Sequence, residues 1–188
     1  MTDTTSTNIN TKHHLALIGF MGAGKSCVAR ELATRYGRDF VDLDDQIEAT
    51  EGKKVSQIFQ DQGERRFREL ELEALTSALA RPKTSIIACG GGIVTSPDCR
   101  ALLRKEAVVV YLHVAAERAI ARIDDWSTRP LLTLAGSNDA VYALAQSRLA
   151  LYEACADINV NTNKRDISEV ADCVVRKLKE AGHADLLA

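Results

Sequence analysis

The sequence has no long apolar run. None of its apolar stretches approaches the roughly 20 residues that a membrane-spanning helix requires, and residues 1–14 lack the apolar stretch of a signal peptide. Those first residues are polar and rich in threonine, so we expect a disordered tail over 1–14. These absences predict a soluble chain that is not exported and has no membrane partner.

The cysteines lack the spacing of a metal site or a disulfide framework. Five of them occur, at positions 27, 89, 99, 155 and 173, and no two form a C-x-x-C pair. An odd number without such pairs favours neither a zinc site nor a closed set of disulfides. We expect reduced cysteines in core positions, which points to the cytoplasm.

Neither sign of charge is in large excess. The formal net charge is −2, which gives no indication of a nucleic-acid partner. An apolar fraction of 46% and a charged fraction of 27% in 188 residues are typical of a soluble globular protein. No repeat, long linker or low-complexity insert interrupts the chain, so we expect one domain over 15–182 and a short tail over 183–188.

Short apolar runs alternate with helical patterns along this domain. We expect strands at 15–18, 39–43, 85–89, 107–113 and 157–160. We expect helices at 27–36, 44–50, 55–60, 64–80, 115–123, 140–154 and 167–180, with Gly63 dividing the third from the fourth. Such alternation indicates an α/β fold with a parallel sheet covered on both faces. Ligands of such sheets bind beyond the carboxyl ends of the strands.

The segment GFMGAGKS at 19–26 matches the phosphate-loop pattern G-x-x-x-x-G-K-[ST], and it lies between an apolar strand and a helix. Its glycines let consecutive backbone N–H groups face a phosphate. Lys25 is the expected catalytic cation on the β- and γ-phosphates, and the Ser26 hydroxyl is an expected magnesium ligand. The residues expected to contact the nucleotide are Gly22, Ala23, Gly24, Lys25, Ser26 and Cys27.

An acidic residue at the end of a second apolar strand holds magnesium in many proteins with this loop. The strand at 85–89 ends without one, whereas Asp42 and Asp44 follow the strand next in sequence to the phosphate loop. Alternation places both carboxylates on one side of an extended segment. One could support the metal while Asp44 accepts a proton from an attacking hydroxyl; the alternative is that Asp44 or Asp45 only caps the following helix.

Three consecutive glycines, Gly90, Gly91 and Gly92, follow the strand at 85–89. Each glycine costs chain entropy, and a turn does not need three. Close approach of a ligand to this backbone explains them better than a flexible turn does.

Two arginines lie on apolar helix faces. Arg148 shares a face with Val141 and Tyr152, and Arg68 is in line with Leu72. A buried cation needs an anionic partner, and two of them suggest guanidinium groups gripping a substrate carboxylate. The alternative is that Arg68 pairs only with Glu71, three residues on, and Arg148 with a distant acid.

A third arginine, Arg129, lies in the irregular stretch 126–132 between two helices. This stretch is long enough to be a lid, and a lid arginine could close over the γ-phosphate while water is excluded. The alternative is a plain surface loop.

The segment NKRD at 163–166 fits the N-K-x-D pattern that GTPases use for guanine, which makes a switch GTPase a rival interpretation. Against it, no D-x-x-G occurs in the sequence and the strand at 85–89 ends without an acid. The position still favours a loop beside a nucleotide base, with Arg165 over the ring.

These motifs, taken in order, resemble those of the shikimate kinases. The likeness extends from about residue 15 to the last helix and includes GFMGAGKS, VDLDD, GERRFRELE, GGG, RPLL and SRLALY. It implies transfer of the γ-phosphoryl group of ATP to the 3-hydroxyl of shikimate, on the pathway to chorismate and aromatic amino acids. It also implies a monomer with a five-stranded parallel sheet in the order 2-3-1-4-5, helices on both faces and a lid.

Carried over by position, the resemblance implies roles for single residues. Asp44 orients and deprotonates the 3-hydroxyl of shikimate. Arg68, Arg148 and the glycines at 90–92 bind its carboxylate and hydroxyls. Arg129 is the lid arginine, with a catalytic role on the phosphates.

The resemblance implies the nucleotide contacts as well. Arg122 and Arg165 flank the adenine, and Asp42 holds Mg²⁺ through water beside Ser26. Cys27 departs from the family, which commonly has threonine after GKS, and Cys89 departs at the position before GGG. Neither position supplies an expected catalytic side chain, so the departures concern thiol sensitivity rather than activity.

Other kinases of small molecules share the phosphate loop and a lid. Gluconate and nucleoside-monophosphate kinases would not need two core-facing arginines together with three glycines. A non-catalytic relative that binds ATP is a further alternative, although every matched functional position is occupied.

Overall fold

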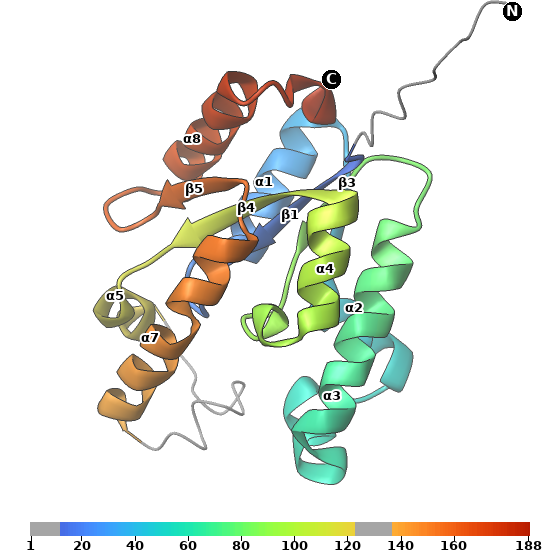
Figure 1. Ribbon diagram of the computed structural model, residues 1–188, viewed down its shortest axis with the longest axis vertical. Helices are drawn as coiled ribbons and strands as arrows, with labels where there is room; N and C mark the ends of the chain where they lie inside the picture. Colours follow the sequence, from blue (N-terminus) through green and yellow to red (C-terminus); the bar gives the residue numbers. More distant parts are fainter. Residues whose placement is uncertain (1–11, 123–136) are drawn as a thin grey trace, which may run out of the picture.

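The computed structural model describes residues 12–122 and 137–188. Its centre is a five-stranded sheet in the order β2-β3-β1-β4-β5, and every neighbouring pair is parallel (Figure 1). The strands are β1 (His14–Ile18), β2 (Asp39–Asp42), β3 (Ser85–Ala88), β4 (Ala107–His113) and β5 (Ile158–Asn161). The expected fold class and strand order are confirmed.

Helices cover both faces of this sheet. They are α1 (Lys25–Tyr36), α2 (Leu43–Glu51), α3 (Val55–Leu79), α4 (Pro97–Glu106), α5 (Ala116–Ala121), α7 (Asn138–Cys155) and α8 (Ile167–Glu180), with 3-10 turns at Ile93–Thr95 and Ala184–Leu187. The connection through α1 joins β1 to β2 and so runs toward the β2 edge of the sheet. The connection through α4 joins β3 to β4 and so runs toward the β5 edge. Right-handed crossovers therefore place α1 and α4 on opposite faces, with α8 packed against α1 and α7 against α4 (Figure 1).

Burial follows from this layering. Residues 15–18 of β1 have no exposed surface, and β3 and β4 are almost as deeply buried, because each has a strand on both sides and helices above and below. These strands accordingly read as continuous apolar runs. The crossovers diverge on either side of β1, so the carboxyl end of β1 is the point where the fold opens a ligand site.

Several boundaries differ from the expectation by one or two residues, and the expected break in α3 is present. Residue 14, placed in the tail by its polarity, is the first residue of β1. The strand expected at 39–43 ends at Asp42, because the Asp42 side chain caps α2 and so makes Leu43 helical. Within α3, Gly63 is non-helical at φ 79° and ψ 172°, as its predicted dividing role requires.

Helix α4 is absent from the expectation. Its start does carry local signals, since the Ser96 side chain accepts a hydrogen bond from the Cys99 N–H and Pro97 occupies the first turn. Only Cys99 and Leu103 are buried along it, so its apolar stripe is weak. The chain end at 183–188 is also more than a tail, because its 3-10 turn buries Leu186 and Leu187.

His14 generates a prediction about acid stability. The imidazole is buried, and its Nδ1 accepts a hydrogen bond of 3.2 Å from the Ser85 N–H. Burial lowers the pKa of His14 below its ordinary value of 6.5. As the pH falls through 6.5, His14 becomes protonated in the unfolded chain but stays neutral in the folded chain. The contribution of neutral His14 to the free energy of unfolding is therefore present above that pH and is lost below it.

Urea unfolding at about pH 7.5 and about pH 5.5 measures this loss. We expect the free energy of unfolding to fall by more in the wild type than in His14→Asn, which keeps an acceptor but does not titrate. Equal losses in the two proteins would contradict the assignment.

Candidate active site

Two hollows adjoin at the carboxyl ends of β1, β2 and β3. The larger is a cavity of about 560 Å³, which we call the nucleotide cavity, and it is lined by residues 21–28 together with Asp42, Asp44, Cys89, Gly91, Arg122, Thr162, Arg165, Asp166, Ile167 and Val170. The smaller, the acceptor pocket, is lined by Met21, Asp44, Val55, Phe59, Phe67, Arg68, Glu71, Gly90, Gly91, Gly92 and Arg148. Most of the expected nucleotide residues line the first hollow and the expected acceptor residues line the second, and the two hollows share Met21, Asp44 and Gly91.

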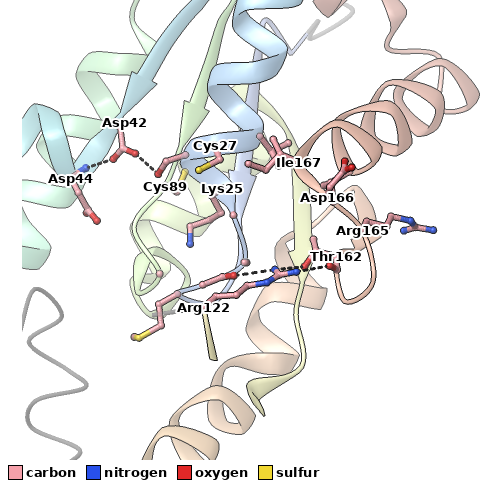
Figure 2. A pocket seen from close by; sticks show the side chains of 18 residues that line it. Lys25, Cys27, Asp42, Asp44, Cys89, Arg122, Thr162, Arg165, Asp166 and Ile167 are labelled. Atoms are coloured by element: carbon pink, nitrogen blue, oxygen red, sulfur yellow. Dashed lines mark hydrogen bonds between the residues drawn. The ribbon is translucent and has the colours of Figure 1, made fainter. Parts of the chain in front are cut away.

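The phosphate loop leaves the N-terminus of α1 open. Gly24 precedes the helix with φ 87° and offers no side-chain cap, so the first N–H groups of α1 face the cavity. Gly22 has φ 75°, and a Cβ there would collide with the backbone of Ala119. Lys25 Nζ donates to the Phe20 carbonyl at 3.1 Å, which holds the side chain along the loop. In Figure 2 this lysine extends into the cavity between Asp44 and Arg122.

Asp42 joins the phosphate loop to α2. Its Oδ2 accepts a hydrogen bond of 2.5 Å from the Ser26 hydroxyl, and its Oδ1 accepts one of 3.0 Å from the Asp44 N–H (Figure 2). The capping role considered for Asp44 or Asp45 therefore belongs to Asp42, a contribution of about 1 kcal/mol. Asp44 itself lines both hollows.

The Ser26–Asp42 pair fits a magnesium ion. Both side chains offer oxygen atoms, the donors that Mg²⁺ prefers, and Mg²⁺ usually takes few protein ligands and completes its shell with water and phosphate. No group of three histidine, cysteine or acidic side chains suited to a metal occurs in residues 12–122 and 137–188. A site with few protein ligands is what these residues can build.

Arg68 holds a dense ion-pair network in the acceptor pocket. Its Nη1 lies 2.7 Å from Glu71 Oε2, and its Nη2 lies 2.9 Å from Glu64 Oε1. Glu71 is fully buried, and burial raises its pKa to about 7 even though Arg68 pulls it down. The pairing proposed as the alternative for Arg68 is therefore real, and Glu64 is a partner that the sequence reading missed despite its i,i+4 spacing.

Arg148 lies in the core, as its place on an apolar face predicts. Only 5% of it is exposed, and its Nη1 donates to the Gly91 carbonyl at 3.1 Å. The Tyr152 hydroxyl donates to the same carbonyl. Among residues 12–122 and 137–188, Arg148 thus donates to a backbone oxygen and forms no ion pair with a distant acid. It lines the acceptor pocket together with Arg68.

The glycines after β3 are needed by the side chains around them. A Cβ at Gly92 would collide with the guanidinium of Arg68, and one at Gly90 would collide with the carboxylate of Glu71 and lie against Asp44. At Gly91 the nearest atom to such a Cβ is the Met21 nitrogen, at an ordinary 3.4 Å. Gly90 and Gly92 therefore leave room for the charged side chains of the site itself. This reason differs from the close approach of a ligand that we expected.

Arg122 connects the phosphate loop to the loop after β5. Its Nη2 donates to the Thr162 carbonyl at 2.9 Å and its Nη1 to the Gly22 carbonyl at 3.3 Å (Figure 2). Arg165 is exposed at the rim of the nucleotide cavity and donates to the Asn161 carbonyl at 2.6 Å. Thr162 is a further lining residue that the sequence reading missed.

The residues of the N-K-x-D match have structural partners. The Asn163 side chain accepts from the Ala115 N–H at 2.7 Å. Asp166 forms a capping box with Glu169 at the start of α8. Both side chains therefore have a structural role at this loop, which explains their presence without a guanine site.

The cysteines divide into two groups. All five are free; Cys89, Cys99, Cys155 and Cys173 are buried, and burial raises the pKa of Cys89. Cys27 is exposed, which corrects the expectation that every cysteine is in the core. Arg129 and the lid proposed at 126–132 lie outside the described residues.

The parallel sheet, the phosphate loop after β1 and the adjoining acceptor pocket define the class of P-loop kinases of small molecules. The model of the family described as shikimate kinase matches residues 21–179. A shikimate kinase of Dehalococcoides mccartyi is 39% identical over 172 residues, which are 92% of this chain and 97% of the relative.

Solved structures agree with that match. A shikimate kinase from Acinetobacter baumannii in complex with shikimate has a TM-score of 0.86 at 31% identity, covering 92% of this chain and 96% of the other. The enzyme from Aquifex aeolicus has a TM-score of 0.79 at 29% identity, covering 91% and 99%. The chain belongs to the shikimate kinase family.

Among the described residues, no helix is both long and apolar enough to cross a membrane.

The contact at Gly92 generates a prediction about acceptor binding. In Gly92→Ala the new methyl group displaces the Arg68 guanidinium, so we expect the KM for the acceptor to rise by about tenfold, or roughly 1.4 kcal/mol. The affinity for ATP is expected to stay within about twofold of the wild type. Steady-state kinetics with each substrate varied in turn measure both.

Gly91→Ala is the matched comparison, because a methyl group there meets only an ordinary contact. We expect a much smaller rise in acceptor KM. Equal effects of the two substitutions would show that the collision with Arg68 is not the cause.

Proposed function

We propose that this protein is a shikimate kinase that transfers the γ-phosphoryl group of magnesium-bound ATP to the 3-hydroxyl of shikimate, giving shikimate 3-phosphate and ADP. The reaction belongs to the pathway to chorismate and the aromatic amino acids. One observation carries the proposal beyond family membership: a nucleotide cavity and an acceptor pocket with two arginines adjoin at a single carboxylate, Asp44.

The nucleotide side binds and neutralises phosphate. The open N–H groups at the start of α1 receive the phosphate oxygens, and Lys25 stabilises the charge that develops on the transferred group. Arg122 and Arg165 line the same cavity, which supports their assignment as the residues that flank the adenine.

Ser26 and Asp42 would hold the magnesium ion, Asp42 through water. When bound, the ion offsets the negative charge of the β- and γ-phosphate oxygens. The short hydrogen bond between these two side chains supports the assignment, because it already brings both oxygen donors to the mouth of the phosphate loop.

Asp44 orients the acceptor hydroxyl and accepts its proton. General-base catalysis of this kind contributes about 10² to 10⁴ in rate. Because Asp42 caps α2 through the Asp44 N–H, the backbone of the base is fixed relative to the phosphate loop. Such positioning is the main contribution a protein makes to phosphoryl transfer.

Arg68 and Arg148 bind the carboxylate of shikimate, and the backbone at Gly90, Gly91 and Gly92 lies beside its hydroxyls. Both arginines line the acceptor pocket and are largely buried, and a guanidinium in such a site pairs with a carboxylate in a fixed geometry. This charge complement favours a small anionic acceptor over the neutral face of a sugar.

Further parts of the proposal rest on the sequence. Arg129 acts on the phosphates from a lid over 126–132. The protein works as a monomer in the cytoplasm, which the five free thiols support, and it has no nucleic-acid or membrane partner.

An ADP-release assay with shikimate, gluconate and nucleoside monophosphates as acceptors tests the assignment. We expect turnover with shikimate alone, because only shikimate combines a ring hydroxyl with a carboxylate of the size that two arginines can grip. Turnover with another acceptor and none with shikimate would overturn it.

The role of Asp44 has its own test. We expect Asp44→Asn to lower kcat by about 10² to 10⁴ while ATP still binds, because the proton acceptor is lost. Asp45→Asn is the matched control, since Asp45 lines neither hollow. Near-normal turnover of Asp44→Asn, or an equal loss in Asp45→Asn, would refute the role.

A further inference from the structure

Among the described residues, one carboxylate oxygen of Glu71 has no hydrogen-bond partner. Its Oε2 accepts from Arg68 Nη1, whereas Oε1 is buried and makes no hydrogen bond in the part of the chain that the structure describes. The residue as a whole has no exposed surface and borders the acceptor pocket. An unpaired oxygen of a buried anion is costly, and a proton on that oxygen lowers the cost because it removes the buried charge.

The surroundings of Glu71 supply charges of both signs. Glu64 on α3 acts on Glu71 only through Arg68, with which it pairs. The titratable and charged groups that interact with Glu71 directly are Arg68 on α3, Asp44 on α2, Arg148 and Tyr152 on α7, Cys99 on α4, and Cys89 at the end of β3. Burial, the largest influence, raises the pKa of Glu71 to about 7; Arg68 and Arg148 lower it, and Asp44 raises it. The carboxyl group is therefore poised between its two forms near neutral pH.

An anionic acceptor changes this balance. Before it binds, Arg68 is already paired with Glu71 and Glu64, so the cation is shared between two carboxylates. A third carboxylate brought between Arg68 and Arg148 takes part of their positive charge and adds a negative charge beside Glu71. Both effects favour the protonated form of Glu71.

We propose that binding of the acceptor carboxylate, on which the proposed function depends, makes Glu71 take up one proton from solvent at Oε1. An O–H bond forms at Glu71, a buffer acid loses the proton, and Oε2 continues to accept from Arg68. Glu71 is thus a positioning residue. In the free protein its negative charge keeps Arg68 in place, and it loses that charge when the acceptor carboxylate binds to Arg68. The proton returns to solvent when the anion leaves.

The pH dependence follows from the sign of this exchange. Below about pH 7 Glu71 is already protonated, so binding takes up little proton and acceptor affinity is at its highest. Above that pH the acceptor must bring in a proton, and affinity falls by up to about tenfold per pH unit.

Calorimetric titration of the full-length protein with shikimate, without nucleotide, measures the uptake directly. At about pH 7.5 the binding enthalpy is measured in buffers of different ionisation enthalpy. The slope of binding enthalpy against buffer ionisation enthalpy gives the number of protons taken up. We expect roughly 0.5 to 0.75 of a proton in the wild type and about none in Glu71→Gln, which keeps the shape of the side chain. Glu64→Gln, at the exposed partner of Arg68, is the control and retains the uptake.

A wild-type measurement covers the case in which Glu71→Gln fails to fold or bind. We expect the uptake to disappear by about pH 6, and the infrared difference spectrum on binding at higher pH to gain a protonated-carboxyl band. Shikimate binding without proton uptake, uptake unchanged in Glu71→Gln, or uptake without the carboxyl band would overturn the proposal. Absence of both shikimate binding and shikimate phosphorylation would instead overturn the proposed function.

Discussion

The carboxylate of Asp42 is the contact on which the site depends. One oxygen binds Ser26 of the phosphate loop and the other caps α2 through the Asp44 N–H. The start of α1 and the start of α2 are thereby held in one arrangement, although they belong to different parts of the chain. Because α2 leads to α3, which carries Arg68, the same contact also orients the acceptor pocket relative to the nucleotide.

The acceptor pocket shows how a fold accommodates charge in its interior. Arg68 and Arg148 are largely buried, and their recorded partners are two glutamates and a carbonyl of the glycine turn. Glycine at positions 90 and 92 is what gives these groups their room. The two arginines and the glycine turn at 90–92 therefore pack as one unit, because a larger residue at position 90 or 92 would displace the charged side chains.

Much of this could be predicted from the sequence, for identifiable physical reasons. The spacing of apolar residues and the local composition predicted the strands. A phosphate loop requires a strand before it and a helix after it. The strand order was predicted from the resemblance to a family. Helix α4 was missed because it buries only Cys99 and Leu103. Three nearby acids at 42, 44 and 45 all suit an N-cap, so local rules could not choose Asp42. The reason for Gly92 is the approach of Arg68, a tertiary contact that no local pattern contains.

The distribution of the thiols has a practical consequence. Four of the five are shielded by the core, and Cys27 alone is exposed, in the first turn of the helix that follows the phosphate loop. The natural chain therefore carries a single attachment point for a fluorophore or spin label at the edge of the nucleotide cavity. Occupancy of that cavity can be followed spectroscopically without replacing any other cysteine.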